Sequence, residues 1–299
     1  MSNAAETSDQ VLYALINEAE DKFYAEGYDP IQRQFFVVGQ VMNRLGYQSF
    51  AMSGPNQPTI LSKVEKLYGN FFRTKDRTRG PLHVGVFMFR DLVAQIEIPL
   101  LFGKVSINPF EMSDLTTFQM NWLCDDKKNQ ENYLSSFYDI FDFGRSIIAM
   151  ADVKLPPKES QAMLGAARSH FISATSVLSG NLGLRGCSQS SLLAAELTIK
   201  ALLKTVGADD KDLKSLGHSI TNCVIAAKNG GADLDFKELL KVTATLPKYV
   251  ADRYSESGLS KVQCGRVLMD CQFIAGEAVR YLTQASVREV FEEQNEQLI

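Results

Sequence analysis

The sequence predicts a mainly α-helical protein of two domains, an N-terminal α+β domain with a small meander of strands and a C-terminal antiparallel helical bundle. Apolar residues recur with helical spacing along most of the chain, and short β-branched and aromatic runs are confined to residues 84–110. The chain has 299 residues, more than the roughly 100–200 of a usual single domain. Two prolines within 154–160 disfavour helix and mark the boundary. We therefore expect domains at 5–153 and 157–288.

The N-terminal domain is expected to begin with three amphipathic helices. Ser8 or Asp9 can cap the first helix. The second has clear ends, because Asp29 can cap it, Pro30 suits its first turn and Gly46 can end it. The expected helices cover 8–26, 29–46 and 60–71, and the apolar stripe of the second comprises Phe35, Val38, Met42 and Leu45.

A meander of strands is expected after these helices. The runs VGVFMF (84–89), LVAQIEIPLLF (92–102) and KVSINPF (104–110) are short, apolar and rich in β-branched and aromatic residues. Turn-forming residues separate them. The stretch 91–103 also fits a helix, and this alternative stays open. Helical spacing returns at 113–124 and 130–151.

Every segment after the two prolines has helical spacing. About five helices joined by short loops imply an antiparallel bundle. The longest is expected to be the last, with an apolar face from Cys264 to Leu282. The remaining residues, 287–299, are expected to form a frayed and exposed tail of that helix.

The composition excludes several classes of protein. The net charge of −4 argues against a basic field over the whole surface, as nucleic-acid-binding proteins often have. No apolar run approaches the roughly 20 residues of a membrane helix, and the N-terminus lacks a signal segment. The five cysteines are an odd number without a C-x-x-C pair, which is typical of reduced thiols in the cytoplasm.

The common catalytic and cofactor motifs are absent from the sequence. It contains no glycine-rich phosphate loop, no H-E-x-x-H or G-x-S-x-G motif and no EF-hand loop. Only three histidines occur, and they are spread along the chain, so a histidine-rich metal site is not expected. We therefore predict no metal and no cofactor.

Two features near residues 196–218 suggest anion binding. Glu196, Lys200 and Lys204 share the polar face of an expected helix at 188–206, where they form either a solvated ion pair or a pair of cations for a phosphate. His218 follows Gly217 at the start of another helix. Free backbone N–H groups and the helix dipole favour an anion there, although the imidazole can equally cap the turn.

Two further groups of residues carry binding chemistry. Arg253 and Tyr254 lie next to each other near a proline, where they can bind a phosphate and stack on a base, or form a clasp between helices. A basic loop is the second group, and it either contacts a nucleic-acid backbone or is simply solvated. Its basic residues are Arg73, Lys75, Arg77 and Arg79.

Three short motifs in the C-terminal half carry a family resemblance. They are AAELTIKALL (194–203), LKSLGHSIT (213–221) and LPKYVADRYSE (246–256). With these motifs, residues 157–285 resemble the HEPN family, the higher eukaryote and prokaryote nucleotide-binding domains. The resemblance implies a compact helical bundle that dimerises, and a role linked to nucleotide binding, toxin–antitoxin pairs or phage defence. The N-terminal domain resembles no family.

The resemblance implies that a nucleotide binds at the Gly-His helix start. Gly217 and His218 would then approach its phosphates. The further nucleotide-binding residues, suggested by their type, are Lys200, Lys204, Arg253 and Tyr254.

One departure from the family concerns catalysis. Ribonuclease members carry an Arg-x4-6-His motif on their final helices, paired across a dimer. Here, 245–285 contains arginines but no histidine, and the spacing occurs only from Arg77 to His83, in the other domain. We therefore expect no catalytic residue.

The first expectation for function is a non-catalytic, nucleotide-binding or interaction protein of HEPN type in bacterial defence or toxin–antitoxin biology. It would form a homodimer through the bundle, bind a nucleotide or RNA, and contact a protein partner through its N-terminal domain. One alternative is a divergent, metal-independent ribonuclease toxin that uses His218 and Arg253. Another is a structural adaptor that dimerises and binds no ligand.

Overall fold

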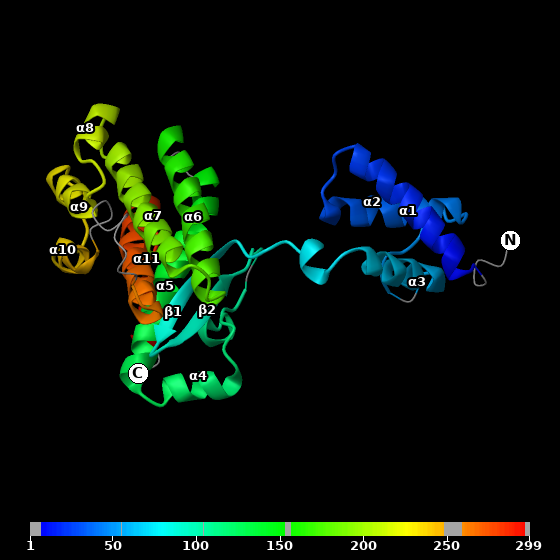
Figure 1. Cartoon of the computed structure of the whole chain (residues 1–299), viewed down its shortest axis with the longest axis horizontal. Coiled ribbons are helices and arrows are strands. Elements are labelled where there is room, and N and C mark those ends of the chain that lie inside the picture. The colour runs from blue at the N-terminus through cyan, green and yellow to red at the C-terminus, as the bar shows by residue number, and fades with distance from the viewer. Residues whose placement is uncertain (1–6, 55, 104, 153–156, 248–258, 297–299) are drawn as a thin grey trace. The chain divides into compact units, whose positions relative to one another are not determined.

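The computed structural model describes residues 7–54, 56–103, 105–152, 157–247 and 259–296. These residues are mainly helical with a packed set of C-terminal helices, as the sequence predicted, and the expected meander of strands is one two-stranded antiparallel hairpin (Figure 1). The chain divides into two compact units, Met1–Gly80 and Pro81–Ile299.

The first unit contains the three expected helices. They are α1 (Asp9–Ala25), α2 (Pro30–Arg44) and α3 (Thr59–Tyr68), followed by 3₁₀ turns at Gly69–Phe71 and Thr74–Asp76. The predicted caps are confirmed, because Ser8 accepts a hydrogen bond from Val11 N and Asp29 forms a capping box with Gln32.

The predicted apolar stripe of α2 was wrong at one position. Phe35 is 68% exposed, whereas Val37 and Val41 are fully buried. Val37 and Val41 are one helical turn apart, on the face that packs against α1 and α3, and Phe35 falls at the edge of that face.

The hairpin opens the second unit. It pairs β1 (His83–Phe89) with β2 (Leu92–Ile98), and Arg90, with φ 57°, starts the two-residue turn between them. The alternative of a helix over 91–103 is therefore excluded. The described residues of 104–110 form no third strand, since Asn108 caps a 3₁₀ turn at Pro109–Glu111. Next come α4 (Thr117–Cys124) and α5 (Lys127–Asp152).

The C-terminal helices follow the prolines, as expected. Asp209 forms a capping box with Asp212, which starts a short helix that was not predicted from the sequence. Helices α6 and α7 are antiparallel neighbours, and α11 packs against both (Figure 1). The helices are α6 (Lys158–Ser179), α7 (Leu184–Thr205), α8 (Asp210–Ser215), α9 (Ile220–Asn229), α10 (Phe236–Thr245), α11 (Lys261–Thr283) and α12 (Val287–Glu296).

The expectation of a frayed tail after the last long helix was wrong. Gln284 adopts the left-handed conformation and ends α11, so α12 is a separate helix. Val287, at the start of α12, is buried, and its backbone N–H donates to Asp142 Oδ1 at 2.8 Å. Docking onto α5 therefore holds the described part of this segment.

The hairpin is part of the same compact unit as the C-terminal helices. All seven residues of β1 are buried, because one face of the strand packs in the bundle core and the other packs against α4 and α5. The sequence placed the domain boundary within 154–160, whereas the contacts divide the chain at Gly80.

A side chain of α11 completes the hydrogen bonding of β1. Gln272 Oε1 accepts from Val86 N at 2.9 Å, and Gln272 Nε2 donates to Val86 O at 2.8 Å. The carboxamide thus occupies the place of a neighbouring strand. This approach requires glycine on the strand, because a Cβ at Gly85 would lie 2.6 Å from Ile140 Cγ1 and 2.8 Å from Gln272 Oε1.

We expect Gln272→Ala to lower the free energy of unfolding by about 2–4 kcal/mol, because it leaves the N–H and C=O of Val86 buried without partners. Urea denaturation of the full chain measures the change. The matched control is Gln130→Ala on α5, whose side chain forms no hydrogen bond among the described residues. Equal losses in the two variants would contradict the role of the Val86 pairing.

Candidate functional site

The Gly-His pair lies in the connection between α8 and α9. Gly217 has φ +60°, a conformation that favours glycine. The N-cap of α9 is Ser219, whose side chain accepts from Asn222 N at 3.2 Å. The ring of His218 turns back to α7, and its Nδ1 lies 3.1 and 3.2 Å from the two carboxylate oxygens of Glu196.

Glu196 is the buried centre of this connection. It is 3% exposed, and Lys200 Nζ donates both to Glu196 Oε1 and to Gly217 O at 2.7 Å. The ion pair of Glu196 and Lys200 is buried because α7 packs among α6, α9 and α11, so most of the surface of α7 faces other helices. Glu196, Lys200 and His218 therefore form a network that ties the connection to α7. The positive charge of Lys200 is balanced within it.

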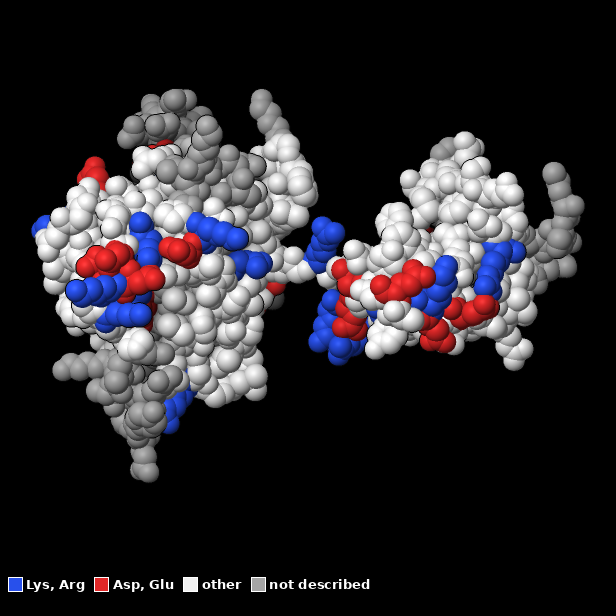
Figure 2. Space-filling model, turned by 90° about the horizontal axis from the view of Figure 1, so that it is seen from above, with Lys and Arg blue, Asp and Glu red and all other residues white. Residues whose placement is uncertain are grey.

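Lys204 is also matched by carboxylates. Its Nζ lies 2.5 Å from Asp210 Oδ1 and 3.6 Å from Glu159 Oε2, and the hydrogen bond to Asp210 raises the pKa of Lys204. Figure 2 shows the same mixture on one face of the larger unit, where lysines and arginines lie beside acidic residues. Gly217, His218, Lys200 and Lys204 thus come together, but without a patch of unmatched positive charge.

The other predicted binding residues are placed differently. Arg253 and Tyr254 lie outside the described residues. In the basic loop, Arg73 forms two hydrogen bonds to Asp76, at 2.8 and 2.9 Å. The remaining basic residues of the loop are half-buried Arg77 and exposed Lys75 and Arg79.

His83 is a core residue and not a base. It is 1% exposed at the start of β1, and its ring centroid lies 4.9 Å from that of Phe143. Burial, aided by the charge of Arg168, lowers the pKa of His83 to about 3. The spacing from Arg77 to His83 therefore forms no ribonuclease motif.

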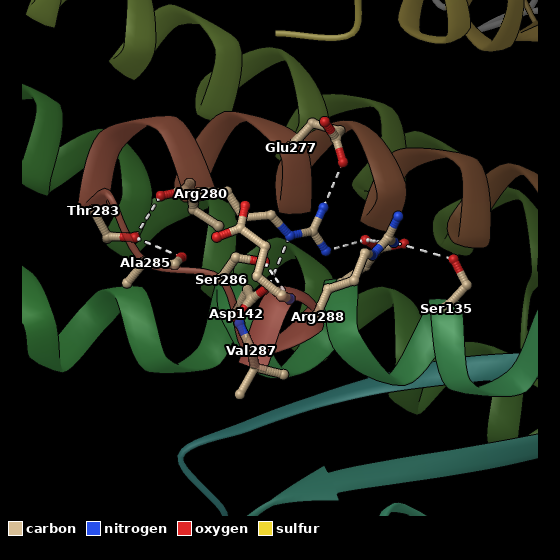
Figure 3. Close-up of polar contacts among 12 residues, drawn as sticks. Ser135, Asp142, Glu277, Arg280, Thr283, Ala285, Ser286, Val287 and Arg288 are labelled. Carbon is tan, nitrogen blue, oxygen red and sulfur yellow. Dashed lines mark hydrogen bonds and ion pairs between the residues drawn. The ribbon is translucent and has the colours of Figure 1, made fainter. Parts of the chain in front are cut away.

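A second charged network, which the sequence did not predict, joins α5 to α11 (Figure 3). Arg280 donates to Asp142 Oδ2 at 2.7 Å and also binds Asp139 and Glu277. Both aspartates are buried. Burial raises the pKa of Asp139 to about 7, although Arg280 and Arg288 oppose this shift.

The same network holds α12. Asp142 accepts from Val287 N, and Arg288 Nη2 donates to Asp139 Oδ1 at 3.0 Å and to Ser135 Oγ at 3.1 Å. Arg288 thereby reaches from α12 to the polar side of α5.

A groove opens beside this network, between the hairpin turn, α5, α10, α11 and α12. Its volume is about 610 Å³, which is within the range of small-ligand sites. We call it the α5–α11 groove. Asn129, Asn132 and Ser136 lie along one wall at helical spacing, and Phe273 of α11 is half-buried in its lining. Its charged lining residues are Arg90, Asp139, Glu238, Asp270 and Arg288.

The groove as a whole leaves no pattern in the sequence, because its residues come from five separate elements. The only local signal is the polar face of α5, where amide and hydroxyl side chains recur at i, i+3 and i+7. That face is equally typical of a solvent-exposed helix.

Metal and membrane features are not found in the described part of the chain. There, no three side chains of His, Cys, Asp or Glu are grouped so that they could hold a metal ion. No helix of these described residues is long and apolar enough to cross a membrane. The five cysteines are free, and burial raises the pKa of Cys187 to about 12 and of Cys223 to about 11, so these two are packed thiols.

Comparisons of the chain with protein-family models, with curated proteins and with solved structures find no match.

We expect Glu196→Ala to lower the free energy of unfolding by about 3–5 kcal/mol, because it leaves Lys200 partly buried without its carboxylate. His218→Ala is expected to cost less than about 1 kcal/mol, because the imidazole is largely exposed. Urea denaturation of both variants measures the difference. A larger loss in His218→Ala than in Glu196→Ala would show that the network is not centred on Glu196.

His83 makes stability depend on pH. The unfolded chain protonates this histidine near pH 6.5, whereas the folded chain does so only near pH 3. Between these values the unfolded state binds more protons, so the free energy of unfolding falls by about 1.4 kcal/mol for each pH unit below 6.5.

The measurement is urea denaturation of the wild type and of His83→Leu at pH 7.5 and 5.5. The wild type is expected to lose about 1.4 kcal/mol more than the variant between these two pH values. The same pH dependence in both proteins would contradict the assignment.

Proposed function

We propose that the chain is a non-catalytic nucleotide-binding protein of HEPN type. The observation that carries this proposal is the α5–α11 groove, which combines an aromatic ring, side-chain amides and hydroxyls, and Arg90, which forms no ion pair among the described residues, in one cavity of about 610 Å³. A nucleotide needs these three kinds of group, for its base, its sugar and its phosphate. The HEPN relation rests on the motifs of the C-terminal half.

Two observations support a function without catalysis. The described C-terminal helices offer no arginine followed at ribonuclease spacing by a histidine. The lysines near the Gly-His pair are matched by Glu196, Asp210 and Glu159, so they offer little unbalanced positive charge to a phosphate under attack or to its leaving oxygen.

The proposal includes a homodimer formed through the helical bundle and a place in bacterial defence or toxin–antitoxin biology. Both rest on the resemblance of 157–285 to HEPN domains. A protein partner would contact the N-terminal helices, where Tyr24 and Phe35 are about 70% exposed.

A divergent, metal-independent ribonuclease is a second candidate, and one observation favours it. The carboxylate of Glu196 holds Nδ1 of His218, while the His218 side chain is 58% exposed. A carboxylate that orients a solvent-facing imidazole is the arrangement of a general base.

We expect calorimetric titration of the full chain to detect ATP or GTP with a dissociation constant in about the micromolar range. A short RNA incubated with the protein and a metal chelator is expected to stay intact. His218→Ala is the control for any cleavage.

Cleavage that disappears in His218→Ala would favour the second candidate. An intact dimer that binds no nucleotide would favour the structural adaptor and would contradict the proposed function.

A further inference from the structure

The charged residues of the α5–α11 groove differ in whether they have partners. Asp139 binds Arg280 and Arg288, and Glu238 binds Lys241 at 2.9 and 3.1 Å. These groups are balanced within the protein. Arg90 and Asp270 are the other two charged lining residues.

Arg90 presents an unmatched guanidinium at the hairpin turn. Its central carbon lies 4.8 Å from the ring centroid of Trp122 and 5.5 Å from that of Phe89, and Arg90 forms no ion pair within the described part of the chain. A guanidinium stacked on aromatic rings keeps its N–H groups directed in its own plane. It can therefore donate two parallel hydrogen bonds to a phosphate.

Asp270 is a partly buried carboxylate on α11 with weak support. Thr245 Oγ1 lies 3.5 Å from its Oδ2, but the single proton of this hydroxyl has a nearer acceptor in Val242 O at 2.8 Å. Arg266, one helical turn earlier, acts on Asp270 only through space. Burial of a carboxylate without strong donors is unfavourable. A ligand with N–H groups at this position would supply them.

Neutral side chains lie between these charged groups. Among the described residues, the side chains of Asn129, Asn132 and Ser136 form no hydrogen bond, and they line the groove together with Phe273 of α11. Phe273 lies three residues after Asp270 on α11, so both side chains are near one face of the helix. A planar ring that binds the carboxylate of Asp270 can therefore stack on the ring of Phe273.

We propose that the α5–α11 groove binds a guanine nucleotide, with the base at Asp270 and Phe273 and the phosphate at Arg90; this rests on the proposed function and identifies its ligand. Guanine carries two adjacent N–H donors on one edge, which match the two oxygens of a carboxylate. Adenine and cytosine have one donor beside an acceptor, and that acceptor would face a carboxylate oxygen. The amides and hydroxyl on α5 bind the ribose.

The test is calorimetric titration of the full chain with GMP, guanosine and AMP. It is made at pH 8, where Asp270 is ionised because its pKa is raised only to about 6. GMP is expected to bind at least about tenfold more tightly than AMP and than guanosine, which is about 1.4 kcal/mol in each comparison.

Two variants test the phosphate end and the base end of the ligand separately. Arg90→Ala is expected to weaken GMP about tenfold and to leave guanosine unchanged. Asp270→Asn is expected to remove the preference for GMP over AMP. The matched controls are Arg145→Ala and Asp125→Asn, which are exposed positions outside the groove. Arg90 is exposed, so its variant tests the proposal even where Asp270→Asn does not fold.

The outcomes distinguish this proposal from the proposed function. Nucleotide binding that Arg90→Ala and Asp270→Asn leave unchanged would overturn the groove and keep a nucleotide-binding function. A wild type that prefers AMP would overturn the guanine assignment. A wild type that binds none of the three ligands, nor ATP or GTP, would overturn both.

Discussion

The larger unit depends on the pairing between the carboxamide of Gln272 and the backbone of Val86. It satisfies the N–H and C=O of Val86 on the open edge of a two-stranded sheet, which alone would be marginal in water and exposed to other chains. It also fixes α11 against β1. Helices α5, α6 and α7 pack on these two elements, so the bundle and the hairpin share one core. The α5–α11 groove is the surface that this arrangement leaves at the hairpin turn.

Local structure could be predicted from the sequence wherever it depends on neighbouring residues. The caps at Ser8 and Asp29 follow from residue type at the helix start, and most of the buried face of α1 and α2 follows from the helical period. The division of the chain into units could not be predicted in this way, because it depends on contacts such as that of Val86 with Gln272, which are 186 residues apart. A proline pair shows where a helix stops, and says nothing about which elements share a core.

The candidate sites show the same contrast between what neighbouring residues reveal and what depends on tertiary contacts. The sequence brought attention to Glu196, Lys200 and His218, and the structure joins these three in one network. Their spacing does not reveal burial, however, because α7 is polar enough to suggest a solvated face. No short-range sequence pattern links Arg90 to Asp270, because one lies in the hairpin turn and the other on α11, far apart in the chain. Sites assembled by tertiary structure leave no local pattern to detect.

The attachment of α12 has a consequence for any ligand in the groove. Arg288 is both a lining residue and, through Asp139, one of the contacts that hold α12 on α5. Groove and helix docking therefore share a side chain, and a ligand that contacts Arg288 would be thermodynamically coupled to the docking of α12. The factor by which such a ligand would change the docking equilibrium of α12 equals the factor by which docked α12 would change the affinity for the ligand, because linkage is reciprocal. Under the proposed function, the last described helix would in this sense be an intramolecular effector of the groove.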